Sequence, residues 1–554
     1  MSALRAEDRD LRVGAVEAPP PPRLAPVPPS PVGPAARPVP PPVGGKRMLG
    51  FLGMVLGMFM AILDIQIVAS SLSEIQAGVS ASADEISWVQ TAYLIAEVVM
   101  IPLSGFLSRA LSTRVLFVVS ALSFTVSSVA CAMANDLSML IVARAAQGFL
   151  GGAMIPTVFA TSFVLFPPQQ RAMATVMTGL VATLAPTIGP TVGGWLTDTF
   201  SWHWLFLINV GPGLVVAATV WSLLDIDRPN LALLRGFDAI GLALMALFLG
   251  SLEYVVEEGP RWNWFDDEAI LVLAIVAAIA GLGFFARVLT YANPIVDLSA
   301  LANRNFSTGS LLGFVMGIGL YGLVYLMPLY LAQVRGLNAM QIGEIMFVTG
   351  LAQFLAAPPS GILVRRIDPR LMLAVGFALV AGSTWLMTSL TADWDFWELL
   401  VPQVLRGVGL MFAMIPITTL ALGTLTPVQI KGASGLFNLM RNLGGAFGLA
   451  GLNTVINDQR ALHWSRLAEH VNPGRPEVQA YIDALGARLG AAMTTDPGAV
   501  VNRRLAALVM RQATLLTFID CFAIMAAMFV AAMLLMPLIR RPALAGGAAS
   551  GGDH

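Results

Sequence analysis

The chain has 554 residues, of which 56% are hydrophobic and 12% are charged, and its mean hydropathy is +0.76. Soluble domains carry about 25% charged residues, so this composition excludes a soluble globular protein and predicts a chain that crosses a membrane many times. The formal net charge is −1 and the basic residues lie at the ends of apolar segments, which argues against a nucleic-acid-binding face.

The first segment is dominated by Pro, Ala and Val between residues 18 and 43. Such a composition cannot bury a core and favours disorder or a polyproline conformation. We expect residues 1–47 to form a disordered cytoplasmic tail, with a Pro-rich recognition segment as the alternative. A second cytoplasmic tail is expected at 541–554.

Apolar segments of about 20 residues can cross a bilayer as helices. The sequence predicts fourteen of them, at 48–71, 86–107, 114–134, 138–164, 172–197, 204–224, 238–256, 269–290, 306–333, 341–363, 371–391, 399–422, 434–457 and 514–537. If the N-terminus is cytoplasmic, most Arg and Lys residues in short connections also lie in the cytoplasm, as the positive-inside rule requires. Both termini are therefore predicted to be cytoplasmic.

A short signature at the end of the second predicted helix recurs at the end of the tenth. Its matching residues are Pro102, Ser104, Gly105, Leu107, Arg109 and Arg114 in the first copy and Pro358, Ser360, Gly361, Leu363, Arg365 and Arg370 in the second. The segment 153–156, Ala-Met-Ile-Pro, likewise recurs at 413–416. Two related halves in the same order are typical of transporters built from parallel repeats, with the substrate site between them.

The position of the repeats predicts the architecture. Two plain six-helix halves would place the second signature on the eighth helix, so the seventh and eighth helices form an inserted pair. The expected fold is an all-α membrane protein with a six-helix bundle at 48–224, an inserted helix pair with linkers at 225–305 and a second six-helix bundle at 306–540. The long outer loop at 458–513 contains helix-like apolar spacing; it is either a cap on the membrane surface or a docking surface for a partner protein.

Ionisable residues within membrane spans are costly and are functional candidates. Asp64 and Glu97 lie within predicted spans, and a carboxyl group removed from water favours its neutral, proton-bound form. Arg144 lies at a depth similar to that of Asp64. We expect these three residues to couple proton movement to transport. The structural alternatives are a packing hydrogen bond for Asp64, a neutral bonded acid for Glu97 and an ion pair for Arg144.

Four other polar residues are candidates for the wall of the cavity: Gln147, Gln353, Arg406 and Arg441. Gln353 stands where the second half would match Glu97, and Arg406 matches Arg144. Arg441 either lines the cavity or extends towards the inner membrane surface. Glu253 and Asp520, near outer helix ends, are expected to be interfacial.

The fifth predicted helix contains Gly189-Pro190-Thr-Val-Gly193-Gly194. Pro removes a backbone hydrogen bond and bends a helix, whereas glycines allow a neighbouring helix to approach closely. This combination suits a helix that packs tightly and deforms during a transport cycle.

Four stretches together resemble the major facilitator superfamily, in its branch of 14-helix drug:proton antiporters. They are Leu63-Asp64-Ile-Gln-Ile-Val, Arg144-Ala-Ala-Gln147-Gly148, the Gly189–Gly194 motif, and Trp202-His-Trp204-Leu-Phe-Leu-Ile-Asn209-Val-Gly-Pro212. The resemblance covers residues 48–540. It implies the major facilitator fold and a role for Arg144 in proton transfer.

The sequence departs from the family pattern in the loop after the second helix. An Asp is usual there, but Arg109 occupies its position and Ser112 replaces the following Gly. The family's usual inner salt bridge is therefore in doubt. The inner gate loops are expected to involve Gly105, Arg109, Arg114, Gly361 and Arg365.

The resemblance further implies antiport of protons and hydrophobic, often weakly acidic toxic compounds across a bacterial inner membrane by alternating access. The proton gradient would drive it without a cofactor. A periplasmic adaptor and an outer-membrane channel are the implied partners.

Two other functions share this fold: dedicated export of one metabolite, and a receptor or scaffold that does not transport. An enzyme is not expected, because the four His residues lie outside the predicted spans and the sequence contains no nucleophile triad, metal-ligand cluster or phosphate-binding loop.

Overall fold

The computed structural model describes residues 43–82, 85–471, 474–490 and 497–539, and within these ranges the regular structure is helical throughout. The described residues belong to one compact unit. The two predicted tails lie almost entirely outside the described residues, and the first helix begins at Gly45.

The first half of the chain contains nine helices. They are α1 (Gly45–Ala69), α2 (Leu72–Val79), α3 (Trp88–Leu111), α4 (Thr113–Ala132), α5 (Leu137–Gly151), α6 (Met154–Val164), α7 (Pro168–Thr199), α8 (Trp204–Leu207) and α9 (Val210–Leu223).

A linker with the short 3-10 helix η1 (Leu231–Gly236) leads to the inserted pair, α10 (Ala239–Glu258) and α11 (Glu268–Thr290), which are joined through η2 (Trp264–Asp266). The second half follows η3 (Leu298–Ala302). It contains α12 (Arg304–Gln333), α13 (Ala339–Arg366), α14 (Pro369–Leu386), η4 (Met387–Ser389), α15 (Phe396–Leu422), α16 (Pro427–His470), α17 (Pro476–Gly490), α18 (Pro497–Met533) and η5 (Met536–Leu538).

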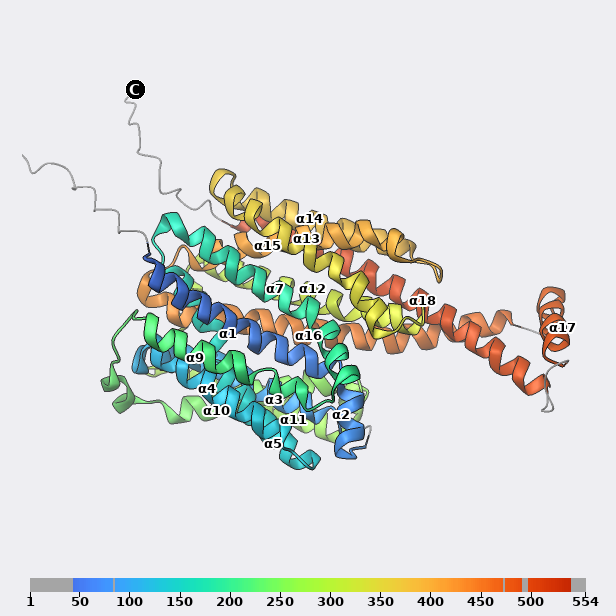
Figure 1. Cartoon of the computed structure of the whole chain (residues 1–554), viewed down its shortest axis with the longest axis horizontal. Helices are drawn as coiled ribbons and strands as arrows, with labels where there is room; N and C mark the ends of the chain where they lie inside the picture. The colour runs from blue at the N-terminus through green and yellow to red at the C-terminus, as the bar shows by residue number, and fades with distance from the viewer. Residues whose placement is uncertain (1–42, 83–84, 472–473, 491–496, 540–554) are drawn as a thin grey trace, which may run out of the picture. The chain divides into compact units, whose positions relative to one another are not determined.

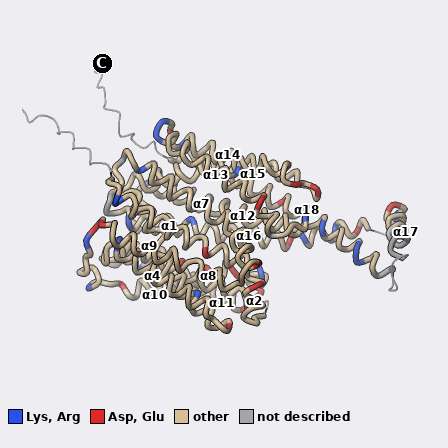
Figure 2. Tube along the Cα trace, viewed as in Figure 1, with Lys and Arg blue, Asp and Glu red and all other residues tan. Residues whose placement is uncertain are grey.

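Thirteen helical segments of the described chain are long and apolar enough to cross a membrane. The predicted span at 434–457 is not among them: it is part of α16, which is long enough but carries Asn438, Arg441 and Asn442 together with several glycines. These residues lower its hydropathy, so its place in the membrane follows from packing against its apolar neighbours and not from composition. In Figure 2 many of the Lys, Arg, Asp and Glu positions lie near the ends of the helices.

Three predicted elements differ in detail. The span predicted at 138–164 consists of α5 and α6, which meet at Gly152, and the span at 204–224 is divided into α8 and α9 before Asn209. Within the predicted outer loop at 458–513, the described residues are largely helical, because α16 continues to His470 and α18 begins at Pro497. Between them lies α17, which contacts α18 beyond the ends of the bundle helices (Figure 1).

Several helices begin at polar residues that cap their free backbone N–H groups. Asp136 accepts a hydrogen bond from Met139 N at the start of α5. Asn338 and Asp395 form capping boxes with Gln341 and Glu398 at the starts of α13 and α15. Such caps each contribute about 1 kcal/mol and fix where a helix begins.

The repeated signature lies at the same place in both halves, in the last turns of α3 and of α13. The halves meet where α7 packs against α13 and α15, and where α3 and α6 pack against α16. The inserted helix α10 packs against α3 of the first half and α16 of the second. The inserted pair therefore touches both halves, and the space between them is bounded by α10 as well.

Candidate functional site

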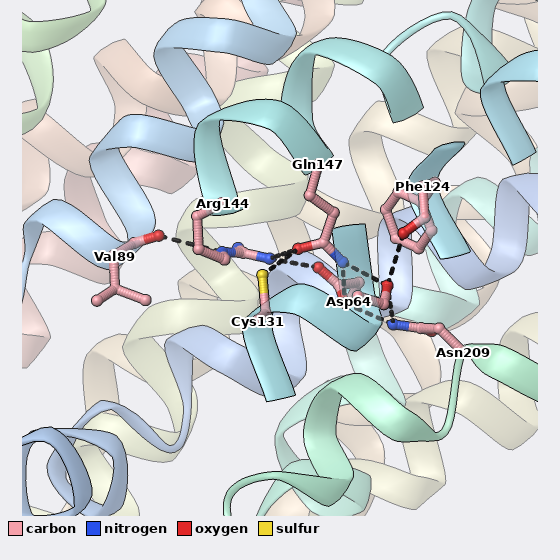
Figure 3. Close-up of polar contacts among 8 residues, drawn as sticks. Asp64, Val89, Phe124, Cys131, Arg144, Gln147 and Asn209 are labelled. Carbon is pink, nitrogen blue, oxygen red and sulfur yellow. Dashed lines mark hydrogen bonds and ion pairs between the residues drawn. The ribbon is translucent and has the colours of Figure 1, made fainter. Parts of the chain in front are cut away.

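Asp64 and Arg144 form an ion pair inside the first half. Asp64 lies in α1, and its Oδ2 accepts a hydrogen bond of 2.6 Å from a terminal guanidinium nitrogen of Arg144 in α5 (Figure 3). Neither side chain is exposed. An unpaired charge at such a position would cost several kcal/mol, so each group depends on the other. Two of the three predicted coupling residues are thus in direct contact.

Three neutral side chains complete the surroundings of the Asp64 carboxylate. Gln147 and Asn209 donate hydrogen bonds of 3.1 and 2.7 Å to its Oδ1. Gln147 also donates to the hydroxyl of Ser128, at 2.8 Å, and Ser128 in turn donates to the backbone carbonyl of Phe124. Asn209 and Ser128 were not predicted from the sequence. Asn209 reaches Asp64 because the chain breaks between α8 and α9 at this residue.

The planar guanidinium group of Arg144 is contacted from several sides. Its Nε donates to the carbonyl of Val89 at 3.1 Å, and the nitrogen bound to Asp64 also donates to Gln147 Oε1 at 2.7 Å. The guanidinium carbon lies 4.2 Å from the ring centre of Tyr93, a cation–π distance. Gly148 permits this close approach of α5 and α3, because a Cβ there would overlap the carbonyl of Tyr93.

This arrangement has two electrostatic states. With Asp64 ionised, the pair is neutral overall. The carboxylate then accepts charge-assisted hydrogen bonds from one charged donor, Arg144, and from two neutral donors, Gln147 and Asn209. When Asp64 takes up a proton, Arg144 keeps its contacts with Val89, Gln147 and Tyr93 but loses the opposing charge. Protonation thus changes the forces that hold α1, α5 and α9 together, which is the requirement for coupling a proton to a helix movement.

A cavity of about 540 Å³ lies between the halves. Its wall includes residues of α1, α3 and α7 from the first half, of α12, α13 and α16 from the second, and of the inserted helix α10. The lining reaches the ends of four of these helices, at Ser70, Ser87, Glu257 and Ala332. All four ends lie on the side that the sequence predicts to be outer.

Glu97 faces this cavity, whereas Asp64 does not line it. Its side chain is 2% exposed, and its Oε1 has no hydrogen-bond partner among the described residues. Arg441, Arg144 and Asp64 are among the charged groups that act on Glu97 electrostatically. The third predicted coupling residue therefore lies at the cavity wall, within electrostatic reach of the ion pair but without a hydrogen bond to it.

The motif of α7 has two faces. Gly189 and Gly193 lie against α1 on the turn after Asp64; a Cβ at Gly189 would overlap Gln66, and one at Gly193 would lie 2.8 Å from the carbonyl of Ile67. Pro190 and Gly194 line the cavity. The motif thus contacts both the cavity and the helix that carries Asp64, and Ile65 and Gln66 of that helix line the cavity as well.

The four residues predicted to line the cavity are not among the residues of its wall, and all four are buried. Gln147 is bound to Asp64. Arg406 donates to the carbonyl of Leu323 at 3.1 Å and to the hydroxyl of Thr349 at 2.9 Å, so a hydroxyl and a carbonyl hold it where Asp64 holds Arg144. Neither polar atom of Gln353 has a hydrogen-bond partner among the described residues. Arg441 is 1% exposed and lies close to Tyr321 and Glu97, behind the cavity wall.

Two acidic residues predicted to be interfacial differ from each other. Asp520 is partly exposed and lies 2.7 Å from Nε2 of His463. Glu253 is instead 5% exposed and lines the cavity. The prediction for Glu253 is wrong because α10 turns this side chain towards α3 and α16, a contact that hydropathy along one helix cannot indicate.

At the opposite end from the cavity, the halves are in contact. A Cβ at Gly105 of α3 would lie 2.8 Å from Cα of Gly432 in α16, so the helices touch there through their backbones. Lys431 forms an ion pair with Asp227, which follows α9, and its Nζ is 3.4 Å from the carbonyl of Ser108. This pair lies where the two halves meet at this end.

The other predicted gate residues have local contacts. Arg109 donates to the carbonyl of Gly105 in its own helix at 3.3 Å, and Arg114 lies over the ring of Trp221 at 5.1 Å. Gly361 packs α13 against α7, where a Cβ would overlap Val176. Arg365 is exposed.

Comparison with known proteins agrees with this architecture. Residues 54–449 match the model of the Major Facilitator Superfamily. The crystal structure of the human organic anion transporter MFSD10 superposes with a TM-score of 0.56 at 14% identity, covering 89% of this chain and 100% of that one. At that identity the likeness concerns the fold alone.

Similarity in sequence extends to individual bacterial relatives. The chain is 45% identical to the colistin resistance protein EmrB of Acinetobacter baumannii, over 76% of this chain and 83% of that protein. It is 32% identical to the multidrug export protein EmrB of Haemophilus influenzae, over 81% and 88% of the two chains. It is also 29% identical to the multidrug export protein EmrB of Escherichia coli, over 92% and 98%. The chain therefore belongs to the major facilitator superfamily and resembles the EmrB proteins of that family over most of its length.

Proposed function

We propose that this protein exports hydrophobic toxic compounds across a bacterial inner membrane in exchange for protons. The observation that carries this proposal is the buried Asp64–Arg144 pair, which Asn209 joins to the start of α9. Asp64 lies on α1, and this helix also lines the cavity between the two repeats. The names of the EmrB relatives, which are called multidrug export and colistin resistance proteins, also support export of toxic compounds.

The proposed cycle is alternating access. The described state has its cavity at the predicted outer side and its halves in contact at the predicted inner end. In this state a proton from outside reaches Glu97 and Asp64 and displaces substrate. The halves then open at the inner end, the proton leaves and substrate binds. A ligand shifts such an equilibrium only by its different affinity for the two states, so substrate and proton must act in opposite directions.

Proton release driven by substrate in proteoliposomes tests the proposal. Wild-type protein should release protons with several unrelated hydrophobic compounds, and Asp64→Asn should abolish the release. Asp520→Asn is the matched control, because that carboxylate is bound to His463 outside the network. Release with one compound only would indicate a dedicated exporter. No release with any compound would contradict transport by proton exchange.

The termini are proposed to be cytoplasmic. The inner end then contains Lys431, Arg365 and Arg366, in agreement with the positive-inside rule. The extensions of α16 and α18 together with α17 would project into the periplasm, where we propose that they contact an adaptor protein of a tripartite pump. Cross-linking from exposed Tyr481 of α17 to a co-expressed adaptor tests this contact, and resistance that is unaffected by deletion of the adaptor would contradict it.

A further inference from the structure

The cavity has an unusual charge balance for a site between membrane helices. Three glutamates line it, Glu97 of α3 and Glu253 and Glu257 of α10, and no Lys, Arg or His occurs among the described residues of its wall. Glu253 interacts electrostatically with two other carboxyl groups, those of Glu257 and Glu97. The basic residue with the strongest electrostatic effect on Glu97 is Arg441, which is not part of the cavity wall. When these carboxyl groups are ionised they repel one another, and a bound cation would offset that repulsion.

A second observation concerns hydrogen-bond acceptors without donors. Oε1 of Glu97 and Oε1 of Gln90, both in α3, are buried in the wall and have no partner within the described chain. The two side chains are 2% and 9% exposed. A buried acceptor without a donor costs about 1–3 kcal/mol. A ligand that brings N–H groups into the cavity would satisfy both oxygens.

The rest of the wall is mostly apolar or aromatic, with neutral polar residues at Gln66, Ser70, Ser87, Thr191, Asn442 and Asn453. Tyr321 and Tyr325 of α12 and Met346 of α13 face the same space. Aromatic faces attract cations, and methionine adapts to apolar groups of varied shape. The cavity therefore combines an acidic side, formed largely by α10, with an uncharged side formed by the second half, in which apolar and aromatic residues predominate.

The inserted helix is fixed firmly enough to act as part of the site. Just beyond α10, the carbonyl of Pro260 accepts a hydrogen bond of 3.2 Å from Asn457, and Trp264 donates one of 3.0 Å to Thr454. Both partners lie in α16. Arg261 donates to the hydroxyl of Ser87, before α3, at 3.0 Å. These contacts hold the end of α10 that carries Glu253 and Glu257 against both halves.

We propose that α10 supplies a cation-binding wall to the cavity, so that the protein takes amphipathic organic ammonium compounds whose N–H groups reach Gln90 and Glu97. This inference rests on the proposed function, since it treats the cavity as the transport site. It differs from the weakly acidic compounds that the family resemblance implies. It also gives the inserted pair a role in substrate choice.

Binding of a matched ligand series to the full-length protein in nanodiscs tests the proposal. The series has one naphthylpropyl frame that ends in a primary ammonium, a trimethylammonium, an alcohol or a carboxylate. At neutral pH the primary ammonium should bind about tenfold more tightly than the alcohol, and the carboxylate should bind most weakly. Equal affinities, or a preference for the carboxylate, would overturn the proposal. A trimethylammonium that binds as tightly as the primary ammonium would overturn the role of Gln90 and Glu97 as acceptors.

Variants of α10 locate the preference. Glu253→Gln combined with Glu257→Gln should remove the tenfold advantage of the ammonium over the alcohol. Glu258→Gln is the matched control, because this next residue accepts a hydrogen bond from Thr91 at 3.1 Å and does not line the cavity. If the double variant does not fold, Glu257→Asp and Glu257→Gln decide instead: the first should keep most of the preference and the second should lose part of it. A preference that persists in the Gln variants would contradict a role for α10.

Proton release measured with the same series separates the two proposals. Proton release driven equally by the alcohol and the ammonium would overturn the cation-binding wall and leave proton exchange intact. A strong ammonium preference in binding without any proton movement would support the wall and contradict the proposed exchange.

Discussion

At the scale of single residues, the Asp64–Arg144 pair is distinguished by its number of partners. The carboxylate accepts from three side chains on α5 and α9, and the guanidinium donates to a backbone carbonyl of the α3 region as well. A buried ion pair often contributes little net stability, whereas removing one partner costs about 3–5 kcal/mol. We therefore interpret the pair as a device that responds to protonation and not as a stabilising core contact.

Arg144→Lys tests whether the shape of the guanidinium matters as well as its charge. A lysine keeps the positive charge but cannot bond Val89, Asp64 and Gln147 together, because its three N–H donors share one nitrogen and are not spread over a planar group. Substrate-driven proton release should fall by at least about tenfold, roughly the 1.4 kcal/mol of one lost charge-assisted hydrogen bond.

Arg406→Lys is the control for this prediction. Arg406 is an equally buried arginine at the matching place in the second half, bound to a hydroxyl and a carbonyl instead of a carboxylate. Proton release should fall much less in this variant. Equal losses in both variants would show that any buried arginine is needed for folding, and that Arg144 has no special part in coupling.

Single residues also show what the sequence could and could not predict. Asp64, Glu97 and Arg144 were recognisable because an ionisable group in an apolar span is costly. Asn209 and Ser128 were not, since neutral polar residues are common in membrane helices and their role depends on a break between α8 and α9. Asp227 was missed because its partner Lys431 belongs to the other half, and no pattern along the chain joins them.

At the scale of elements, hydropathy predicts a helix well where one continuous apolar helix forms the whole membrane span. It is weaker for α16, whose glycines and polar residues are explained by what packs against them. It also cannot indicate which face of α10 meets the cavity, because that depends on α3 and α16. The clearest case of close packing is the contact of α12 with α16. A Cβ at Gly444 would overlap the carbonyl of Phe314, and one at Gly317 would overlap that of Arg441.

Gly444→Ala should therefore destabilise the protein, because the added methyl group meets backbone that cannot rotate away. The expected loss is about 1–3 kcal/mol, the usual cost of overpacking, seen as a lower thermal unfolding temperature in detergent. Gly451→Ala, on the same helix, is the control: no atom lies within 4 Å of a Cβ at that position. Its unfolding temperature should be unchanged or slightly raised. A similar decrease for both variants would attribute the effect to glycine flexibility in α16 and not to the close contact.

At the scale of the whole molecule, the two ends of the interface between the halves are unequal. The cavity reaches helix ends on one side, while on the other side Gly105 touches Gly432 and Asp227 pairs with Lys431. Both contacts cross from the first half to the second, so they exist only while this end is closed. Asp227 also accepts a hydrogen bond from the backbone N–H of Thr113 at 2.9 Å, which fixes the carboxylate in the first half and makes Lys431 the moving partner.

Asp227→Asn should shift the population towards the state that is open at the inner end. Asparagine keeps the acceptor for Thr113 but removes the charge that holds Lys431. A partly exposed ion pair contributes about 1 kcal/mol at most, which corresponds to a change of roughly fivefold in the ratio of the two states. Spin labels at exposed Arg47 and Arg366, in a protein with Cys131 and Cys521 replaced by alanine, would report this as a larger fraction of long distances.

Arg287→Gln is the control, because its ion pair with Asp238 lies within the inserted pair and does not join the halves. An unchanged distance distribution in Asp227→Asn would mean that backbone contact at Gly105 and Gly432 is sufficient to hold the inner end closed.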